Sequence, residues 1–275
     1  MDQLDVLLWL ALQEDLGHAD VTSVATIPAD LTGRARVHGR EPFVLSGSHA
    51  FQRVFQILDD TTRVRCFFED GQAVAAHAPV FELEGKVRTL LAGERTALNL
   101  LQRLCGVATL TRKMVEALSA TPCRLLDTRK TTPLWRALEK QAVRHGGGHN
   151  HRFNLADGVL IKDNHIAAAG SIKEAVQRAK TQAPHTLRIE VEVDTLEQLD
   201  EALHAAVDVI LLDNFSVEML RRAVTRTRGR ALLEASGGVT LESVHAIAQT
   251  GVDFISCGAL THSARAIDIG LELLG

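Results

Sequence analysis

The fold class is decided by the stretch LRIEVEVDTLEQLDEALHAAVDVILLD, residues 187–213. Two short apolar runs, at 187–194 and 207–213, each end in an aspartate, and the segment between them has helical character. A strand, a helix and a second strand in this order form a βαβ unit with parallel strands. The stretch therefore predicts an α/β architecture for this part of the chain.

The same unit repeats on both sides of this stretch. Further apolar runs are CRLLD at 123–127, DGVLIKD at 157–163, ALLEAS at 231–236 and VDFISCG at 252–258, and helical segments follow most of them. About six such units after Ala120 indicate a complete or incomplete α/β barrel, with an open doubly wound sheet as the structural alternative.

Polar residues where these runs end favour the barrel. Loops from different strands converge at the C-terminal face of a barrel, and active sites lie there. The polar residues at or near the strand ends are Asp127, Lys162, Glu190, Glu192, Asp213, Glu234 and Ser256. We therefore expect an active site at this face.

The N-terminal part of the chain has a different pattern. Apolar residues at helical spacing from Leu4 to Leu12 predict a helix that Gly17 ends, and a polar turn is expected at residues 20–23. Strand patterns at 32–45, 63–68 and 79–84 and a helix at 48–58 predict a small α+β domain with an antiparallel sheet. Residues 90–120 read as helical, with a break at Gly106.

Two domains follow from these patterns, an N-terminal domain at residues 1–110 and a catalytic α/β barrel at 111–275. The C-terminal residues could pack back on the first domain. The helical pattern around residues 90–120 is the connection between the two architectures.

Composition narrows the class of protein. The chain has 275 residues, 46% hydrophobic and 23% charged, as is usual for a globular protein. A net charge of -4 argues against a nucleic-acid binder. The four cysteines lack C-x-x-C spacing, which suits a reducing compartment, and no stretch approaches the roughly 18 apolar residues of a membrane span. We expect a cytoplasmic protein that binds neither nucleic acid nor a membrane.

Positive charge nevertheless concentrates between Asp127 and His165, around the glycine run 146–148. Guanidinium groups fork onto two oxygens and ammonium groups supply point charges, so such clusters recognise carboxylates or phosphates. The basic residues of this stretch are Arg129, Lys130, Arg136, Lys140, Arg144, His145, His149, His151, Arg152 and Lys162. Since the rest of the chain is acidic on balance, the ligand is expected to be a small anion.

Acidic residues and glycine turns extend this interpretation. Glu192 and Asp213 are hard oxygen ligands suited to Mg²⁺, which usually bridges substrate phosphates with few protein ligands. The turns Ser236-Gly237-Gly238 and Ser256-Cys257-Gly258-Ala259 follow the last two strands, where barrels commonly bind a phosphate. Cations, a magnesium site and a phosphate site together describe the transfer of a phosphoribosyl group. No Ser-His-Asp order, zinc spacing, Walker pattern or GxGxxG pattern supports another class.

Long motifs make the chain resemble the quinolinate phosphoribosyltransferase family over nearly its whole length. The motifs are EDLGHADVTS at 14–23, GERTALNLLQRLCGVAT at 93–109, DTRKTTPLWRALEKQAVRHGGGHNHR at 127–152, LIKDNHI at 160–166, IEVEVD at 189–194, LLDNFS at 211–216, LEASGG at 233–238 and ISCGALTHS at 255–263. The resemblance implies an N-terminal α/β sandwich, a C-terminal incomplete α/β barrel of the type II phosphoribosyltransferase kind, and a homodimer that could assemble further into a hexamer.

The resemblance also implies an activity and its residues. The family transfers the phosphoribosyl group of phosphoribosyl pyrophosphate to quinolinate with loss of CO₂, giving nicotinate mononucleotide and pyrophosphate for NAD biosynthesis. Quinolinate would contact Arg95, Arg129, Lys130, His151, Arg152 and Lys162. Phosphoribosyl pyrophosphate would contact Thr128, Lys130, Lys162, Glu192, Asp213, Ser236, Gly237, Gly238, Ser256, Gly258 and Ala259. Catalytic roles would fall to Lys130, Lys162, Glu192 and Asp213, with Mg²⁺ at the last two.

Spacing alone suits Arg95 to a helix surface, whereas the resemblance implies that Arg95 reaches across the dimer interface to a quinolinate carboxylate of the partner's site. Phe153-Asn154 stands where many relatives have a smaller pair, so the shape of that loop is not given by the resemblance.

Three alternatives stay open from the sequence. A relative associated with molybdate transport would share the scaffold. An aldolase-type barrel would use Lys162 as a Schiff-base lysine. A protein without catalysis would bind the phosphoribosyl compound and leave it unchanged.

Overall fold

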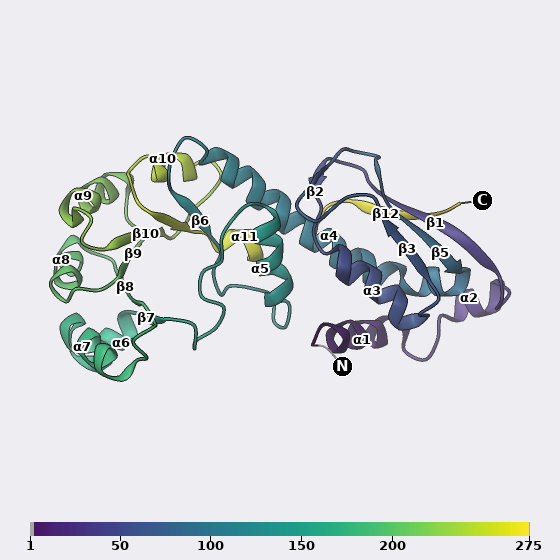
Figure 1. The fold of residues 1–275 in the computed structure, drawn as a ribbon, viewed down its shortest axis with the longest axis horizontal. Helices are drawn as coiled ribbons and strands as arrows, with labels where there is room; N and C mark the ends of the chain where they lie inside the picture. Colours follow the sequence, from purple (N-terminus) through teal and green to yellow (C-terminus); the bar gives the residue numbers. More distant parts are fainter. Residues whose placement is uncertain (1–2, 275) are drawn as a thin grey trace. The chain divides into compact units, whose positions relative to one another are not determined.

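The computed structural model describes residues 3–274 and divides them into two compact units, whose helices and strands are labelled in Figure 1. The first unit comprises the residues up to Arg112, Pro133–Gly147 and the residues from Ala264 on; the second comprises Lys113–Thr132 and Gly148–Ser263. The segment Pro133–Gly147, inside the predicted catalytic range 111–275, thus groups with the first unit. Met1, Asp2 and Gly275, at the outer limits of the two predicted domains, lie outside the described residues.

The first unit is built on an antiparallel sheet of four strands in the order β12-β1-β5-β3. Their bounds are β12 (Ile269–Leu274), β1 (Thr32–Gly39), β5 (Pro79–Lys86) and β3 (Arg63–Cys66). A separate pair joins β2 (Phe43–Val44) to β4 (Ala73–Val74). The last residues of the chain therefore return to the first unit as an edge strand.

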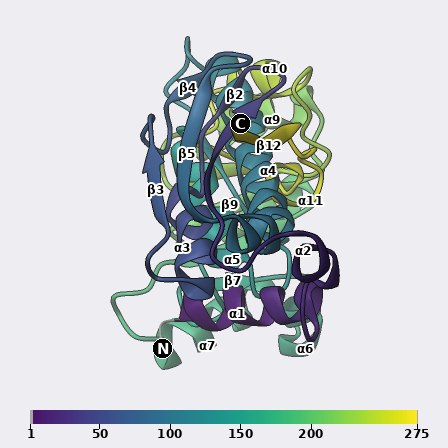
Figure 2. The same cartoon turned by 90° about the vertical axis from the view of Figure 1, so that its right-hand side faces the viewer.

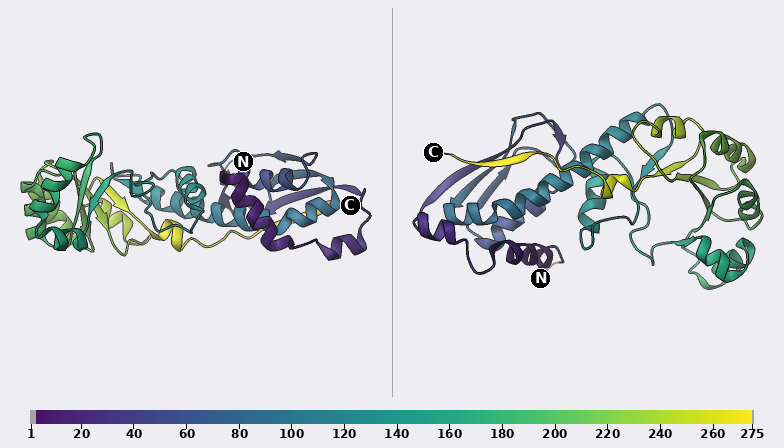
Figure 3. Two further views of the ribbon diagram at one scale, coloured as in Figure 1. Left: turned by 90° about the horizontal axis from the view of Figure 1, so that it is seen from below. Right: turned by 180° about the vertical axis from the view of Figure 1, so that it is seen from behind.

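The helices of this unit include α1 (Gln3–Leu16), α3 (Ser48–Leu58) and α4 (Val87–Ala117), which lie beside the sheet (Figure 1). Helix α5 (Arg136–His145) is also grouped with this unit. Figures 2 and 3 show α1 beside α3, and Figure 3 shows α3 and α4 on one face of the sheet. Phe51 and Phe55 of α3 and Phe81 of β5 are fully buried, with the rings of Phe51 and Phe81 stacked 4.3 Å apart. Burial of such apolar area is the main term that stabilises a domain of this size.

Two local expectations for this unit were wrong. The polar turn expected at residues 20–23 is the start of helix α2 (Val21–Thr26), because the Asp20 carboxylate caps the helix by accepting the backbone N–H of Ser23 at 3.0 Å. The single strand expected at 32–45 is interrupted after Gly39 and resumes as β2. Capping and turn residues share a composition, so the sequence alone does not separate the two uses.

The prediction of a helix break at Gly106 was also wrong, because α4 passes through Gly106 without interruption and is 31 residues long in total. A Cβ atom at this position would lie 2.0 Å from the backbone oxygen of Arg265. Gly106 therefore allows the segment that leads into β12 to cross close to the helix.

The second unit contains all six predicted strands in one parallel sheet of order β6-β11-β10-β9-β8-β7. Their bounds are β6 (Arg124–Leu126), β7 (Val159–Ile161), β8 (Ile189–Val193), β9 (Val209–Asp213), β10 (Leu232–Ser236) and β11 (Phe254–Ser256). The first strand along the chain pairs with the last, so the sheet curls into a ring that is open between β6 and β7. This pairing confirms the incomplete barrel over the open doubly wound sheet.

Helices lie outside this ring of strands, as Figure 1 shows for α7 to α10. Their bounds are α6 (Asp163–Ala169), α7 (Ile172–Gln182), α8 (Leu196–His204), α9 (Val217–Thr227), α10 (Val244–Ala248) and α11 (Ala259–His262). An isolated parallel bridge joins His149 to Leu126, so the residues after His149 run along the open side of β6. This placement directs the His151-Arg152 pair toward the C-terminal ends of the strands.

Candidate active site

A cavity of about 290 Å³ opens at the C-terminal ends of the six strands. It is lined by Thr128, Arg129, Lys130, His151, Arg152, Leu160, Lys162, Glu192, Leu211, Asp213, Glu234, Ser236 and Ser256. Four cations from three points of the stretch 127–165, Arg129 with Lys130, Arg152 and Lys162, meet here. The geometry therefore brings most of the residues predicted for both substrates into one cavity.

The loop after β6 presents three of these residues. The backbone N–H of Lys130 donates to the Thr128 hydroxyl at 3.0 Å, which makes a tight turn of the loop. The hydroxyl of Thr261 donates to the carbonyl of Lys130 at 2.7 Å. Since Thr261 is fully buried on α11, this bond fixes the backbone from which the Lys130 side chain extends.

The next strands contribute a cation and two carboxylates. Lys162, directly after β7, forms an ion pair with Glu192 of β8. Asp213 ends β9, the neighbour of β8, and accepts the side-chain N–H of Asn214 at 2.8 Å. Two carboxylates on adjacent strand ends, one of them facing a lysine, therefore lie among the cations of this cavity.

Arg152 occupies the open side of the ring. Its guanidinium Nη1 donates to the carbonyl of Gly158 at 3.0 Å, across the residues that lead into β7. Burial, together with the nearby charge of Arg129, lowers the pKa of Arg152. Two guanidinium groups this close repel each other, so they bind most favourably to a ligand that brings more than one negative charge.

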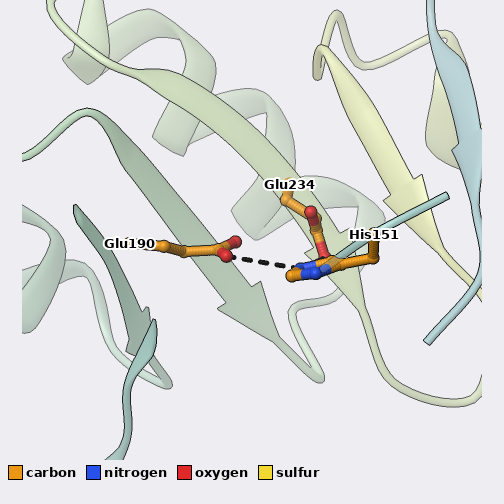
Figure 4. A group of neighbouring side chains, drawn as sticks. All are labelled: His151, Glu190 and Glu234. Carbon is orange, nitrogen blue, oxygen red and sulfur yellow. Dashed lines mark ion pairs between the residues drawn. The ribbon is translucent and has the colours of Figure 1, made fainter. Parts of the chain in front are cut away.

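A buried cluster of three side chains lies deeper in the ring. Figure 4 shows the ring of His151 facing the carboxylates of Glu190 of β8 and Glu234 of β10. His151 Nε2 lies 3.3 Å from Glu190 Oε2 and 3.5 Å from Glu234 Oε1. Burial lowers the pKa of His151, but the hydrogen bond and charge of Glu190 and the charge of Glu234 leave it raised. Burial and the Glu190 charge raise the pKa of Glu234 to about 7. Protons are thus held in this cluster close to neutral pH.

A second cavity, of about 210 Å³, lies on the far side of this cluster. Its walls include Glu190, Val209 and Phe254, which belong to the interior of the strand ring. His151, Arg152 and Glu234 line both cavities. The cluster is therefore part of the wall between the substrate side and the interior of the barrel.

The glycine turns after β10 and β11 flank the cavity. Ser236 and Ser256 line it, whereas Gly237, Gly238, Gly258 and Ala259 follow in the same loops. Gly237 has a φ of 95°, and a Cβ there would lie 2.1 Å from the Asn214 side chain. A side chain at this position would thus push away the loop that carries Asp213.

Arg95 is the predicted site residue that belongs to the first unit. It lies exposed on α4, and no hydrogen bond or ion pair is found for it among residues 3–274. Arg95 thus lies on a helix surface, as its spacing predicted, but does not form the ion pair with Glu94 that such a position would allow.

Sequence reasoning placed Glu190 and Glu234 at strand ends but assigned them no role. The signal that could have found them is alternation, because residues two apart on a strand face the same side. Glu190 and Glu192 both face the interior of the ring, one below the other. Leu160 and Leu211, which supply apolar wall, carry no signal beyond their strands.

An incomplete parallel barrel with cations and carboxylates gathered at its strand ends defines an α/β enzyme for small, multiply charged anions. Two family models match the chain: quinolinate phosphoribosyl transferase, N-terminal domain, over residues 20–105, and the C-terminal domain over residues 107–272. The chain therefore belongs to the quinolinate phosphoribosyl transferase family, which confirms the resemblance and the predicted fold.

Individual relatives agree with this assignment. The chain is 44% identical over 271 residues to a probable nicotinate-nucleotide pyrophosphorylase (carboxylating) of Bacillus subtilis, covering 98% of this chain and 93% of that one. It is 46% identical to the nicotinate-nucleotide pyrophosphorylase (carboxylating) of Mycobacterium leprae, covering 96% and 94%. The structure of the nicotinate-nucleotide pyrophosphorylase from Francisella tularensis superposes with a TM-score of 0.95 at 43% identity, covering 99% of this chain and 96% of that chain.

None of the helices formed by residues 3–274 has the length and apolar character needed to cross a membrane.

Proposed function

We propose that the protein transfers the phosphoribosyl group of phosphoribosyl pyrophosphate to quinolinate and releases pyrophosphate and CO₂, forming nicotinate mononucleotide. The observation that carries the proposal is the single cavity that combines Arg129, Lys130, Arg152 and Lys162 with the carboxylates of Glu192 and Asp213. The names of the relatives support this substrate pair. The molybdate-associated, aldolase and non-catalytic alternatives have no such support.

The cations address the main obstacle to this reaction, which is charge. Quinolinate carries two carboxylates, and its cosubstrate carries a phosphate and a pyrophosphate, so the two molecules repel each other. Arg129 and Arg152 would fork onto the quinolinate carboxylates, with Arg95 of a second subunit as a further partner. Lys130 and Lys162 would lie between the two substrates as point charges. Bringing the reactants together in a fixed orientation can account for a large share of the rate enhancement.

The acidic residues fit a magnesium ion that arrives with the phosphates. Glu192 and Asp213 offer carboxylate oxygens from adjacent strands to one cavity, the donor type and small ligand number that Mg²⁺ uses beside substrate phosphates. When bound, Mg²⁺ neutralises charge on the leaving pyrophosphate. The ion pair of Glu192 with Lys162 would hold both side chains in place before the substrates enter.

The chemical steps then need few groups from the protein. The bond from ribose C1 to pyrophosphate breaks while the pyridine nitrogen forms its bond to C1, and the developing positive charge on the ribose is favoured by Glu192 and Asp213. The product of this step has a cationic ring. Loss of the 2-carboxylate as CO₂ leaves its electron pair on C2, where the ring cation stabilises it until a proton is taken up. Lys130 and Lys162 would favour departure of the pyrophosphate.

The remaining site residues would hold the cosubstrate. Thr128, Ser236 and Ser256 line the cavity with hydroxyl groups, and Gly237, Gly238, Gly258 and Ala259 bring backbone close to it. A phosphate commonly binds between the last two strand loops of a barrel, and glycine there lets backbone N–H groups approach it. The 5′-phosphate would be bound here.

A homodimer is part of the proposal, since Arg95 would serve the site of the partner subunit. Its exposure on α4 supports this role, because the guanidinium is free to meet another chain. Val6, Trp9 and Leu10 of α1 are exposed apolar residues of the same unit, as a buried interface would use. A further assembly to hexamers and a cytoplasmic location stay predictions.

A coupled assay tests the function. The protein is incubated with quinolinate, phosphoribosyl pyrophosphate and Mg²⁺ while pyrophosphate and CO₂ are followed together, with nicotinate as a parallel substrate. We expect equal amounts of both products from quinolinate and none from nicotinate, which lacks the 2-carboxylate. Binding of the phosphoribosyl compound without turnover of quinolinate would contradict the proposal and favour the molybdate-associated relative.

A further inference from the structure

One residue with a left-handed backbone lies directly beside the cavity. Among residues 3–274, the residues other than glycine with a positive φ are His77, Leu134, Ala206, Asn214 and Arg228. This conformation is costly for a residue with a side chain and is enriched at functional sites. Asn214, with a φ of 56°, follows the cavity residue Asp213 at the end of β9. Its neighbourhood therefore shows what the side chain does there.

The side chain of Asn214 contacts two parts of the proposed cosubstrate site. Its N–H donates to Asp213 Oδ2 at 2.8 Å. Its oxygen faces Gly237, because a Cβ atom on Gly237 would lie 2.1 Å from Asn214 Oδ1. The backbone N–H of Asn214 also donates to the carbonyl of Ser236 at 2.9 Å. Asn214 therefore joins the carboxylate at the end of β9 to the loop that follows β10.

The carboxamide orients Asp213 without neutralising its charge. It occupies one carboxylate oxygen, and the other oxygen, Oδ1, accepts no hydrogen bond within residues 3–274. Glu192, the second predicted magnesium ligand, instead faces the charge of Lys162. Because an amide is uncharged, Asp213 keeps its full negative charge and a free oxygen for a cation or a hydroxyl donor.

The two groups that Asn214 joins would hold opposite ends of one ligand. Under the proposed function, Asp213 serves the ribose and Mg²⁺, and the loop of Gly237 binds the 5′-phosphate. Asn214 and Gly237 both lie just beyond the ends of their strands, where no further strand pairing fixes their separation. Groups that are already in position bind more tightly, because ordering them during binding costs free energy.

A purely structural role would require only the backbone conformation of Asn214. The chain turns here from β9 toward α9, where Ser216 caps the helix by accepting the backbone N–H of Met219 at 3.3 Å. Glycine would serve this turn as well, since it adopts a positive φ without steric cost. The hydrogen bond to Asp213 and the contact with Gly237 belong to the carboxamide, which glycine lacks.

We propose that Asn214 is a positioning residue for the cosubstrate: its carboxamide holds Asp213 and the Gly237 loop at the separation that binds phosphoribosyl pyrophosphate. The inference rests on the proposed function in taking Asp213 and this loop as ligands of that compound. It gives Asn214 no contact with a substrate and no part in the chemical steps.

Equilibrium binding without turnover tests this role. Titration calorimetry measures the Kd of phosphoribosyl pyrophosphate with Mg²⁺, and separately the Kd of quinolinate, for the wild-type protein and Asn214→Gly. The substitution keeps the positive φ and removes the carboxamide. We expect the Kd of phosphoribosyl pyrophosphate to rise roughly fivefold to tenfold, as for the loss of one hydrogen bond to a charged group near solvent. The Kd of quinolinate should stay unchanged.

Ala206→Gly is the matched control, because Ala206 is exposed, has a φ of 52° and lies outside the cavity. It should leave both Kd values unchanged. Equal Kd values of phosphoribosyl pyrophosphate in Asn214→Gly and Ala206→Gly would overturn the inference, as would an equal loss of quinolinate affinity in Asn214→Gly. Failure of the wild-type protein to bind phosphoribosyl pyrophosphate would instead contradict the proposed function itself.

A second substitution disturbs the same contact from the other side. The Cβ of Gly237→Ala would displace the Asn214 carboxamide, so this variant should also raise the Kd of phosphoribosyl pyrophosphate. In the double variant the carboxamide is absent, so the combined increase in Kd should be smaller than the product of the two single increases. An increase equal to that product would show that Asn214 and Gly237 act independently and would overturn the inference.

Discussion

The raised pKa of Glu234 makes the stability of the second unit depend on pH in a defined direction. The folded protein holds the proton on this carboxyl up to a pKa of about 7, whereas an ordinary glutamate releases it near 4.5. Stability from this group is therefore full below pH 4.5, falls as the pH rises toward 7 and stays reduced above. Because one pKa unit corresponds to 1.36 kcal/mol, the loss amounts to about 3 kcal/mol.

The substitution Glu234→Gln should remove this dependence. Glutamine has the shape of the protonated carboxyl and can donate a hydrogen bond, but it never acquires a charge beside Glu190. We expect the variant and the wild-type protein to be similarly stable at pH 4.5 and the variant to be more stable by about 3 kcal/mol at pH 8. The charges of His151 and Lys162 lower the pKa of this carboxyl, and the value of about 7 already includes their effect.

Urea denaturation followed by circular dichroism at several pH values measures the effect. Both tryptophans, Trp9 and Trp135, belong to the first unit, so their fluorescence reports on the unit that lacks Glu234. The exposed residue Glu201 provides the matched control Glu201→Gln, which makes the same chemical change outside the buried cluster. A difference between Glu234→Gln and the wild-type protein that is constant from pH 4.5 to pH 8 would refute the reasoning.

Further predictions concern the cations, the metal and the long helix. Arg152→Ala should raise the quinolinate KM by roughly tenfold or more, because the substitution removes at least one charged hydrogen bond to the substrate. An unchanged KM in steady-state assays would show that Arg152 does not bind quinolinate. Lys162→Ala should lower kcat by on the order of tenfold. A higher KM with unchanged kcat would exclude a role of Lys162 in the transition state. Removal of Mg²⁺ with a chelator should abolish turnover, and added Mg²⁺ should restore it; full activity without the ion would contradict the magnesium proposal. Gly106→Ala should destabilise the protein by about 1–3 kcal/mol in urea denaturation, because the new Cβ would meet the Arg265 carbonyl, whereas Gly158→Ala, with open space around it, should have little effect.

The six strands of the barrel could be recognised from sequence because each is a short apolar run that repeats with a helix. Parallel strands are covered on both faces, so their residues must be apolar over several consecutive positions, a signal that survives without tertiary information. The cations of the site were equally visible, since a local excess of Arg and Lys in an acidic chain has few explanations. Their meeting in one cavity followed from the rule that active sites lie at the C-terminal ends of barrel strands.

Local signals failed where one residue type serves several purposes. Asp20 caps a helix where a turn was expected, and Gly106 admits a crossing segment where a helix break was expected. The role of Asp20 depends on the local backbone geometry, and the role of Gly106 depends on the distant residue Arg265. The pairing of β12 with β1, which joins residue 274 to residue 34, is a contact of the same long-range kind.

The sequence by itself determined the class of the barrel, the family and the anionic character of the ligands, because these depend on residue types and on their order along the chain. Only the tertiary structure decided how Glu190 and Glu192 differ, although they stand two residues apart on β8. Glu192 lines the cavity beside Lys162, whereas Glu190 lies one level deeper against His151. Depth in the ring sets the water access of each carboxylate and the charges around it, and therefore which proton or partner it can hold.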